Sequence, residues 1–189
     1  MMQLTNYKFD VPGADIRSLI HLIGNHGKNL IGCELGVFKA QSLLAVLQAC
    51  PNIKMIYGVD SFEPYEDLIA TDYYSRDVKE MEIVKFLAYH NIKYSGVADK
   101  VKILEMRTEK ALSKIKDNEL DFIFIDSYLS YEQAYNEINS WYCKVKKGGI
   151  YAGHDARNSF IMQAVNNFIK NKKLKNNLQV WDDTWSMIK

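Results

Sequence analysis

Apolar residues along the chain fall into two kinds of run. Short continuous runs are typical of strands buried on both faces, and longer runs with apolar residues every three or four positions are typical of helices. The short runs predict strands over 30–35, 53–59, 101–104, 120–125 and 150–152. The longer runs predict helices over 15–26, 42–49, 78–89, 109–115, 131–145 and 159–170. Strands and helices therefore alternate along the chain.

Turn signals mark the ends of several of these elements. The run 146–149, Lys-Lys-Gly-Gly, predicts the stop of the preceding helix, because glycine readily ends helices. Near the end of the chain, the runs 178–181 and 184–188 predict two strands around a tight turn. Trp181 and Trp185 flank this turn, and we expect both to anchor the hairpin in the core.

The order of the elements predicts the fold class. Alternating strands and helices indicate right-handed crossovers and a mostly parallel sheet with helices on both faces. We expect an α/β fold, a Rossmann-like three-layer sandwich whose mostly parallel seven-stranded sheet ends in a C-terminal antiparallel hairpin. The chain has 189 residues, and its size predicts a single domain over 1–189.

The segment 61–96 is long for one connection in a small α/β domain. It is rich in tyrosines and acids, which include Tyr65, Tyr73, Tyr74, Glu63, Glu66, Asp67 and Asp72. Aromatic walls with a few acids suit a small polyhydroxylated or aromatic ligand, so one interpretation is a lid that holds an acceptor substrate. The alternative is a surface insertion whose tyrosines pack on the core.

Composition narrows the range of partners. The net charge is +1, so electrostatics do not favour a nucleic acid or an anionic membrane as partner. No run reaches membrane-spanning length, and the first ten residues lack the apolar core of a signal peptide. We expect a cytoplasmic protein whose partner is a small-molecule acceptor, and the sequence leaves a homodimer open. Cys33, Cys50 and Cys143 lie in apolar surroundings without zinc spacing and fit reduced, buried cysteines.

Acidic residues follow four of the predicted strands. Glu34, Asp60 and Asp126 come at or directly after three of them, and His154 and Asp155 follow the fifth. Because the carboxyl ends of parallel strands share one edge of a sheet, these side chains are expected to lie together. Ligands of such sheets bind at that edge, where the strand order reverses. Packing alone does not account for so many acids there.

The first strand leads into the most informative turn. Gly36 lets the backbone pass close to a ligand, and the helix that begins at Ser42 offers amide groups to an anion. The turn lacks the G-x-G-x-x-G pattern of dinucleotide sites. Asp60, at the end of the second strand, could accept hydrogen bonds from a ribose diol, or it could be a cap or turn residue.

The order and spacing of several motifs together point to a known family. These are Glu34-Leu35-Gly36, Ser42, Gly58-Val59-Asp60, Asp121-Phe122-Ile123-Phe124-Ile125-Asp126, Lys147-Gly148-Gly149-Ile150 and Gly153-His154-Asp155. From about Leu30 to the C-terminal hairpin, the chain resembles class I S-adenosylmethionine-dependent methyltransferases. It is most similar to the small O-methyltransferase-like group that includes catechol and macrocin O-methyltransferases.

The resemblance implies a binding site for S-adenosylmethionine. The residues that it assigns to this cofactor are Glu34, Gly36, Ser42, Asp60, Thr108 and Asp126. Glu34 and Gly36 would line the methionine part, and Ser42 would bind its carboxylate. Asp60 would bind the ribose hydroxyls, and Thr108 would stand beside the adenine. Two features depart from the family pattern: Ala40 replaces a usual glycine, and Met106-Arg107 replaces small or acidic residues.

The resemblance also implies a metal site and catalytic groups. Relatives that use a divalent ion take ligands from the ends of the fourth and fifth strands, which here are Asp126, His154 and Asp155. Carboxylate oxygens suit Mg²⁺, whereas an imidazole favours a transition metal. The alternative is that the acids hydrogen-bond the cofactor amine and nearby loops. Asp126 and His154 are the expected catalytic residues.

Leu129 stands where relatives carry a histidine or lysine that serves as general base. Leucine cannot accept a proton, so either His154, Tyr131 or a metal assists instead, or the reaction needs no strong base, or catalysis is lost. The leading hypothesis is a methyltransferase acting on a hydroxyl oxygen of a small molecule, a sugar or an aromatic compound. The main alternative is a catalytically inactive cofactor-binding or scaffold domain. A nicotinamide-dependent oxidoreductase is the third, and the missing glycine pattern argues against it.

Overall fold

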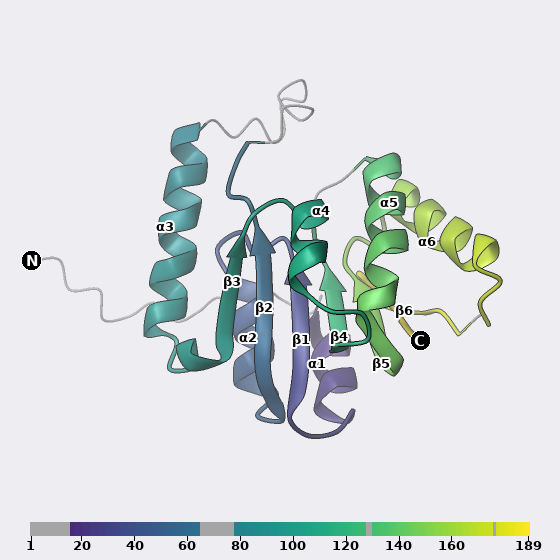
Figure 1. Ribbon diagram of the computed structural model, residues 1–189, viewed down its shortest axis with the longest axis horizontal. Helices are drawn as coiled ribbons and strands as arrows, with labels where there is room; N and C mark the ends of the chain where they lie inside the picture. The colour runs from purple at the N-terminus through teal and green to yellow at the C-terminus, as the bar shows by residue number, and fades with distance from the viewer. Residues whose placement is uncertain (1–15, 65–77, 128–129, 176) are drawn as a thin grey trace, which may run out of the picture.

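The computed structural model describes residues 16–64, 78–127, 130–175 and 177–189, which form a sheet between two layers of helices (Figure 1). The strands are β1 (Leu30–Leu35), β2 (Ile53–Asp60), β3 (Val101–Glu105), β4 (Leu120–Ile125), β5 (Val145–Gly153), β6 (Gln179–Trp181) and β7 (Thr184–Ile188). The helices are α1 (Arg17–Gly24), α2 (Gln41–Ala49), α3 (Val78–Tyr94), α4 (Thr108–Ala111), α5 (Tyr131–Trp141) and α6 (Ser159–Asn171). Short 3₁₀ turns follow α3, α4 and α5.

The sheet has the order β3-β2-β1-β4-β5-β7-β6. The strands from β1 to β5 pair in parallel, and β7 runs antiparallel to both β5 and β6. The predicted α/β class, the seven strands and the C-terminal hairpin are therefore confirmed. The strand order reverses between β1 and β4, so the carboxyl ends of these two strands open the crevice in which such sheets bind ligands.

The core has one layer on each face of the sheet. Helices α1, α2 and α3 cover one face and helices α4, α5 and α6 the other (Figure 1). Strand β4 shows how one sequence serves both layers. Phe122 and Phe124 pack with α1 and α2, whereas Ile123 and Ile125 pack with α5 and α6. Alternate residues of a strand point to opposite faces, which explains why the run from Phe122 to Ile125 is continuously apolar.

Strand β5 and the end of α5 differ from the prediction. The helix predicted over 131–145 ends at Trp141, and the run 146–149, predicted as a helix stop, lies inside β5. Pairing of β4 with β5 jumps over these four residues, so they form an irregularity in the strand. Two backbone hydrogen bonds from this irregularity to Lys189 hold it in place. Contacts with Lys189, which is remote in sequence, therefore contribute to the structure of this segment.

Two other helices also differ in length. Helix α3 continues to Tyr94, five residues beyond its predicted end at position 89. The helix predicted over 109–115 is one α-helical turn, α4, that continues as a 3₁₀ turn over 112–114. Both differences concern element ends, which local sequence patterns define poorly.

One of the two tryptophans and one of the three cysteines that were predicted to be buried are exposed. Trp185 is fully buried beside β5, as expected, but the side chain of Trp181 is about half exposed. Trp181 belongs to the edge strand β6, where it makes an edge-to-face contact with His21. All three cysteines are free, and Cys33 and Cys50 are buried, but Cys143 is exposed.

Several predictions fall on residues outside the described ranges. These are the lid tyrosines at 65, 73 and 74, the acids at 66, 67 and 72, and Leu129. Within the described ranges, no helix has the length and apolar character needed to cross a membrane.

Candidate functional site

Backbone hydrogen bonds join the carboxyl ends of the central strands. The amide of Gly36 donates to the carbonyl of a β2 residue over 2.9 Å, and the amide of Asp126 donates to the last residue of β1 over 2.8 Å. The amide of His154 donates to the last residue of β4 over 2.9 Å. These bonds bring the ends of β1, β2, β4 and β5 to one edge, so the acids that follow the strands are gathered as the sequence predicts.

Asp60 holds the loop between β1 and α2. Its Oδ2 atom accepts hydrogen bonds from the amides of Val37 and Phe38, each at 2.9 Å, and its Oδ1 atom accepts from the amide of Phe62 at 2.8 Å. A carboxylate offers about four acceptor sites, so three of them are used within the protein. The turn role considered for Asp60 is therefore present in the structure. Its contact with ribose stays a prediction.

The loop that Asp60 holds has an unfavourable backbone conformation. Gly36, Phe38 and Ala40 have φ values of +85°, +50° and +61°. Side-chain-bearing residues in this left-handed region cost roughly 1–2 kcal/mol each, so Phe38 and Ala40 are strained. The value at Ala40 is one that glycine adopts without strain, in keeping with the glycine that the resemblance implies at this position. Such strain persists where the surrounding structure imposes it. The amide of Phe38 is held by Asp60, and the amide of Ala40 donates to the carbonyl of Val37.

Glu34 is a buried acid on β1 whose side chain contacts the start of α2. Its carboxyl group accepts a hydrogen bond of 2.5 Å from the hydroxyl of Ser42, and only 1% of the residue is exposed. Burial raises the pKa of the Glu34 carboxyl well above its ordinary value, and the charges of Asp126 and Asp60 raise it further. The hydrogen bond from Ser42 acts in the opposite direction. The two residues predicted to hold the methionine part of a cofactor are thus in contact.

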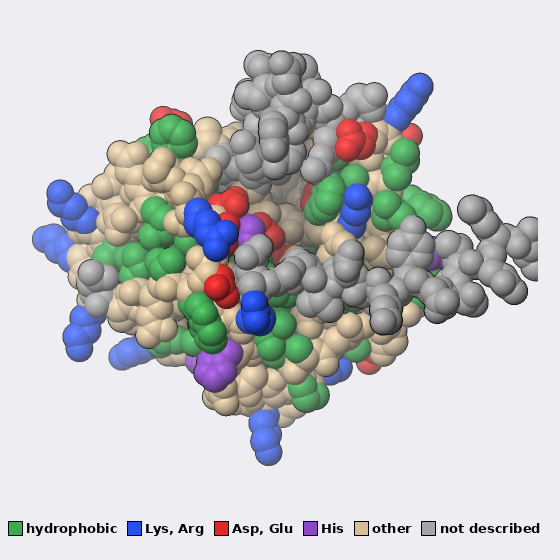
Figure 2. Space-filling view, turned by 180° about the vertical axis from the view of Figure 1, so that it is seen from behind, with side chains coloured by type: hydrophobic (Ala, Val, Ile, Leu, Met, Phe, Trp, Pro, Cys, Tyr) green, Lys and Arg blue, Asp and Glu red, His purple; other side chains and the backbone are tan. Residues whose placement is uncertain are grey.

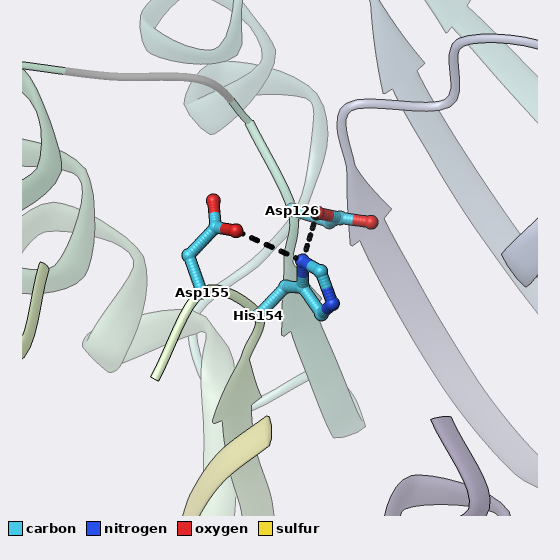
Figure 3. Close-up of side chains that lie close together, drawn as sticks. All are labelled: Asp126, His154 and Asp155. Carbon is cyan, nitrogen blue, oxygen red and sulfur yellow. Dashed lines mark ion pairs between the residues drawn. The ribbon is translucent and has the colours of Figure 1, made fainter. Parts of the chain in front are cut away.

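His154 lies between two carboxylates (Figure 3). Its Nδ1 atom is 3.3 Å from Oδ1 of Asp126 and 3.2 Å from Oδ1 of Asp155. These hydrogen bonds, led by the one to Asp126, raise the pKa of His154 to about 10 although burial opposes the shift. Desolvation raises the pKa of the Asp126 carboxyl, against the effect of His154. In the absence of another cation, His154 is therefore protonated at neutral pH and offsets part of the charge of the two acids.

Asp126, His154 and Asp155 also form a candidate cation site. One ligand atom from each residue can be chosen so that all three lie within 4.8 Å of one another. Two carboxylates and one imidazole are a mixed set that suits Mn²⁺ or another transition metal as well as Mg²⁺. The three side chains are partly exposed, and Figure 2 shows acidic and histidine side chains together near the middle of one face. The predicted metal ligands are thus placed together.

A buried polar cluster behind the site was missed by the sequence analysis. Glu137 on α5 is 5% exposed, and its carboxyl group accepts a hydrogen bond from the hydroxyl of Ser127. Thr108, predicted beside the adenine, also hydrogen-bonds to Glu137. Burial raises the pKa of the Glu137 carboxyl, which favours its neutral form. One signal was available in the sequence, because Glu137 shares the inward face of α5 with Ala134 and Ile138.

Glu137 connects two segments that flank the site. Thr108 begins α4 after β3, and Ser127 directly follows Asp126 after β4. A single buried carboxyl group therefore ties the segment predicted to flank adenine to the segment that carries a predicted metal ligand. The hydroxyl of Thr108 faces this cluster, so its contact with adenine stays a prediction.

Comparison with known proteins places the chain among methyltransferases. Residues 33–156 match a family described as "Methyltransferase domain". All the strand-end residues of the site, from Glu34 to Asp155, lie within this range. A comparison with curated proteins finds no match.

Solved structures with the same fold include several methyltransferases. The O-methyltransferase NovP is 19% identical with a TM-score of 0.64, and the match covers 92% of this chain and 77% of NovP. A cofactor-bound protein from MTB is 13% identical with a TM-score of 0.63, covering 95% of this chain and 84% of the other. An S-adenosylmethionine-dependent O-methyltransferase from Thermotoga maritima is 15% identical with a TM-score of 0.61, covering 88% and 52% respectively. At these identities, the likeness shows a shared fold.

The close approach of Gly36 to the end of β4 generates a prediction about stability. A methyl group on Gly36 would overlap the carbonyl of Asp126, whereas one on Gly148 would meet nothing within 4 Å. Both glycines have similar positive φ values, +85° and +82°, so Gly148→Ala controls for backbone strain alone. We expect Gly148→Ala to lower the free energy of unfolding by about 1 kcal/mol and Gly36→Ala by about 3 kcal/mol or more in urea titrations. Equal losses would contradict the close packing of the two loops.

The raised pKa of His154 generates a prediction about pH. In protein freed of metals by a chelator, ¹H–¹⁵N NMR should show the His154 imidazole protonated well above its ordinary value of 6.5, with a pKa of about 10. Because the folded-state pKa lies above the unfolded one, its stabilising effect is complete below pH 6.5 and is lost as pH rises towards 10. Asp126→Asn should lower the pKa. Titration of His154 near pH 6.5 in the wild type would contradict the arrangement in Figure 3.

Proposed function

Because the chain belongs to the methyltransferase domain family, we propose that it transfers a methyl group from S-adenosylmethionine to a hydroxyl oxygen of a small molecule. The family match over 33–156 carries this proposal, because that range contains the whole strand-end site. The fold is the Rossmann-like one of class I S-adenosylmethionine-dependent methyltransferases in the O-methyltransferase-like group. The acceptor class, a sugar or an aromatic compound, is part of the proposal.

The charge of the site supports a cationic cofactor. When bound, S-adenosylmethionine supplies an electrophilic methyl group on a positively charged sulfur. Burial and the charges of Asp60 and Asp126 raise the pKa of Glu34, so a positive ligand at this edge relieves repulsion among the acids. The first turn of α2 presents backbone amides near Ser42, a location suited to the cofactor carboxylate. Asp126 is within the same cluster and would accept a hydrogen bond from the cofactor amine.

The remaining acceptor capacity of Asp60 fits one ribose hydroxyl. Three backbone amides already donate to its carboxylate, which orients both oxygen atoms before any ligand arrives. Thr108 and the segment that it begins are held by Glu137 on the side where adenine is expected. In this arrangement, the chain positions the methyl donor with groups that are already hydrogen-bonded, so little reorganisation is needed.

The acceptor hydroxyl requires a group that removes or stabilises its proton. With a pKa of about 10, His154 is protonated at neutral pH and cannot act as a general base in the metal-free protein. A divalent cation held by Asp126, His154 and Asp155 would supply the positive charge that the imidazolium now provides and would lower the pKa of a bound hydroxyl. The carboxylates of Asp126 and Asp155 are suited to hold Mg²⁺ or Mn²⁺.

The protonated state of His154 also favours a second candidate function. A protein that binds S-adenosylmethionine but has no base for a hydroxyl acceptor would serve as a cofactor-binding or scaffold domain. Turnover separates the two: methylated product from any hydroxyl acceptor in a broad panel supports the enzyme, whereas cofactor binding without product across the panel supports the scaffold.

Calorimetric binding of S-adenosylhomocysteine tests the cofactor site. We expect binding by the wild type, a dissociation constant raised at least about tenfold in Gly36→Ala, and one within about twofold of the wild type in Gly148→Ala. Gly36 packs against Asp126 within the site, whereas Gly148 lies in the distant irregularity of β5. An absence of binding by the folded wild type would overturn the proposed function.

Chelation tests the metal part of the proposal separately. After treatment with EDTA, methyl transfer should fall at least about tenfold and return when Mg²⁺ or Mn²⁺ is added. Asp155→Asn should weaken the response to metal, whereas Asp117→Asn, which changes an exposed acid paired with Lys144, should leave it unchanged. Metal addition should also shift the NMR signals of His154. Activity unaffected by chelators would exclude a metal requirement and leave the cofactor site intact.

A further inference from the structure

Helix α3 is apolar on two opposite faces. Its inner face packs against the core through Met81, Val84, Ala88 and Ile92. On the other face, the side chains of Ile83, Phe86 and Tyr94 are exposed by 59%, 66% and 65%. A helix that is apolar on both sides is typical of one that is covered on both sides. The outer face of α3 therefore has the character of an interface.

Three exposed residues and the partly buried His90 form a continuous ridge. Ile83, Phe86, His90 and Tyr94 are three or four residues apart, so they follow one another along the same side of the helix. The ring centroids of Phe86 and His90 are 5.9 Å apart, and those of His90 and Tyr94 are 4.7 Å apart. We call these four residues the α3 ridge. Its aromatic groups match the residue types that are enriched at protein interfaces.

The position of α3 leaves the ridge accessible. The helix lies at the end of its layer, beside the edge strand β3 (Figure 1). Lys85 and Tyr89 of α3 bind Glu105 at the end of β3, which fixes the side of the helix that faces the sheet. The ridge points away from these contacts, so a second helix can approach it along its length.

We propose that the α3 ridge is the interface of a homodimer in which α3 packs antiparallel against α3 of a second copy. A two-fold axis between Phe86 and His90 sets each of these rings against the other in the partner copy. The sequence flanking the ridge is self-complementary in charge only in this direction. Glu82 lies four residues before Phe86, and Lys93 lies three residues after His90.

The charges that flank the ridge select the antiparallel direction. At about 100° per residue, Glu82 and Lys93 lie on the same side of the ridge, and both are exposed. In the antiparallel pair, Glu82 of each copy faces Lys93 of the other, which gives two ion pairs per dimer. In a parallel two-fold pair, the flanks that carry Glu82 and Lys93 lie on opposite sides of the contact, so neither ion pair forms. Charge complementarity therefore identifies a second copy as the occupant.

The size of the contact predicts a weak dimer. One pair of helices of this length buries less surface than the roughly 1,200–2,000 Å² of a stable interface. We therefore expect monomer and dimer to exchange with concentration. The ridge contains none of the residues proposed to bind cofactor or metal, so the inference is independent of the proposed function.

Sedimentation velocity over a range of protein concentrations tests the interface. We expect a concentration-dependent dimer of the full chain and only monomer for Phe86→Asp. Because Phe86 is exposed, the variant should keep its fold, and circular dichroism checks this. Lys172→Glu, which reverses an exposed charge at the end of α6, should dimerise as the wild type does. A wild type that stays monomeric at its highest attainable concentration, or a Phe86→Asp variant that still dimerises, would overturn the proposal.

Charge reversal tests the antiparallel direction. Glu82→Lys or Lys93→Glu alone should raise the dimer dissociation constant about tenfold, because two ion pairs become two repulsive contacts. The double variant Glu82→Lys/Lys93→Glu should restore it to within about threefold of the wild type. Rescue supports the reciprocal pairing of the two copies. Failure of the double variant to recover would exclude it.

Discussion

The hydrogen bonds that Asp60 accepts are the interaction on which the candidate site depends. Its carboxylate binds two amides of the loop between β1 and α2 and one amide beyond β2. The bond to the amide of Phe38 holds that residue in a left-handed conformation that costs roughly 1–2 kcal/mol, and Ala40, two residues later, is left-handed as well. The loop in turn sets the start of α2, where Ser42 reaches the buried carboxyl group of Glu34. One strand-end carboxylate thus places the first turn of the helix, its amides and a second acid relative to the sheet.

The gathering of acids at one edge of the sheet then decides what the site can bind. Burial raises the pKa of Glu34, Asp126 and Glu137, because none of these carboxyl groups is fully solvated. Around Asp126, the protonated His154 supplies the compensating charge. A sulfonium and a divalent cation are both positive, and either would offset the negative charge that remains when one imidazolium faces two carboxylates. The proposed cofactor and the proposed metal therefore follow from the same electrostatic feature.

Prediction from the sequence succeeded where local pattern determines structure and failed where a distant partner does. Short runs rich in apolar residues located β1, β2, β3 and β4, and the acids at the ends of β1, β2, β4 and β5 marked the edge of the candidate site. The run 146–149 looks like a helix stop, but its hydrogen bonds to Lys189 place it in β5. Trp181 and Trp185 look alike in sequence, and only the order of the strands puts Trp181 on the edge. Glu137 was missed because its partners, Ser127 and Thr108, come from two other segments.

Helix α3, which carries the proposed dimer interface, lies apart from the candidate site. The site is built from the carboxyl ends of the strands and the start of α2, whereas the α3 ridge faces outward beside the edge strand β3. An edge strand presents unpaired backbone groups and is open to unwanted pairing with other chains. Docking a second copy through α3 would shield this side of the sheet while leaving the strand-end residues of each copy in place. The hairpin of β6 and β7 covers β5 at the other side of the sheet, where the exposed Trp181 lies on the last strand. The two edges of the sheet thus differ. The hairpin of β6 and β7 extends the sheet at one edge, and at the other edge α3 lies beside β3 with an outer face that suits a second copy.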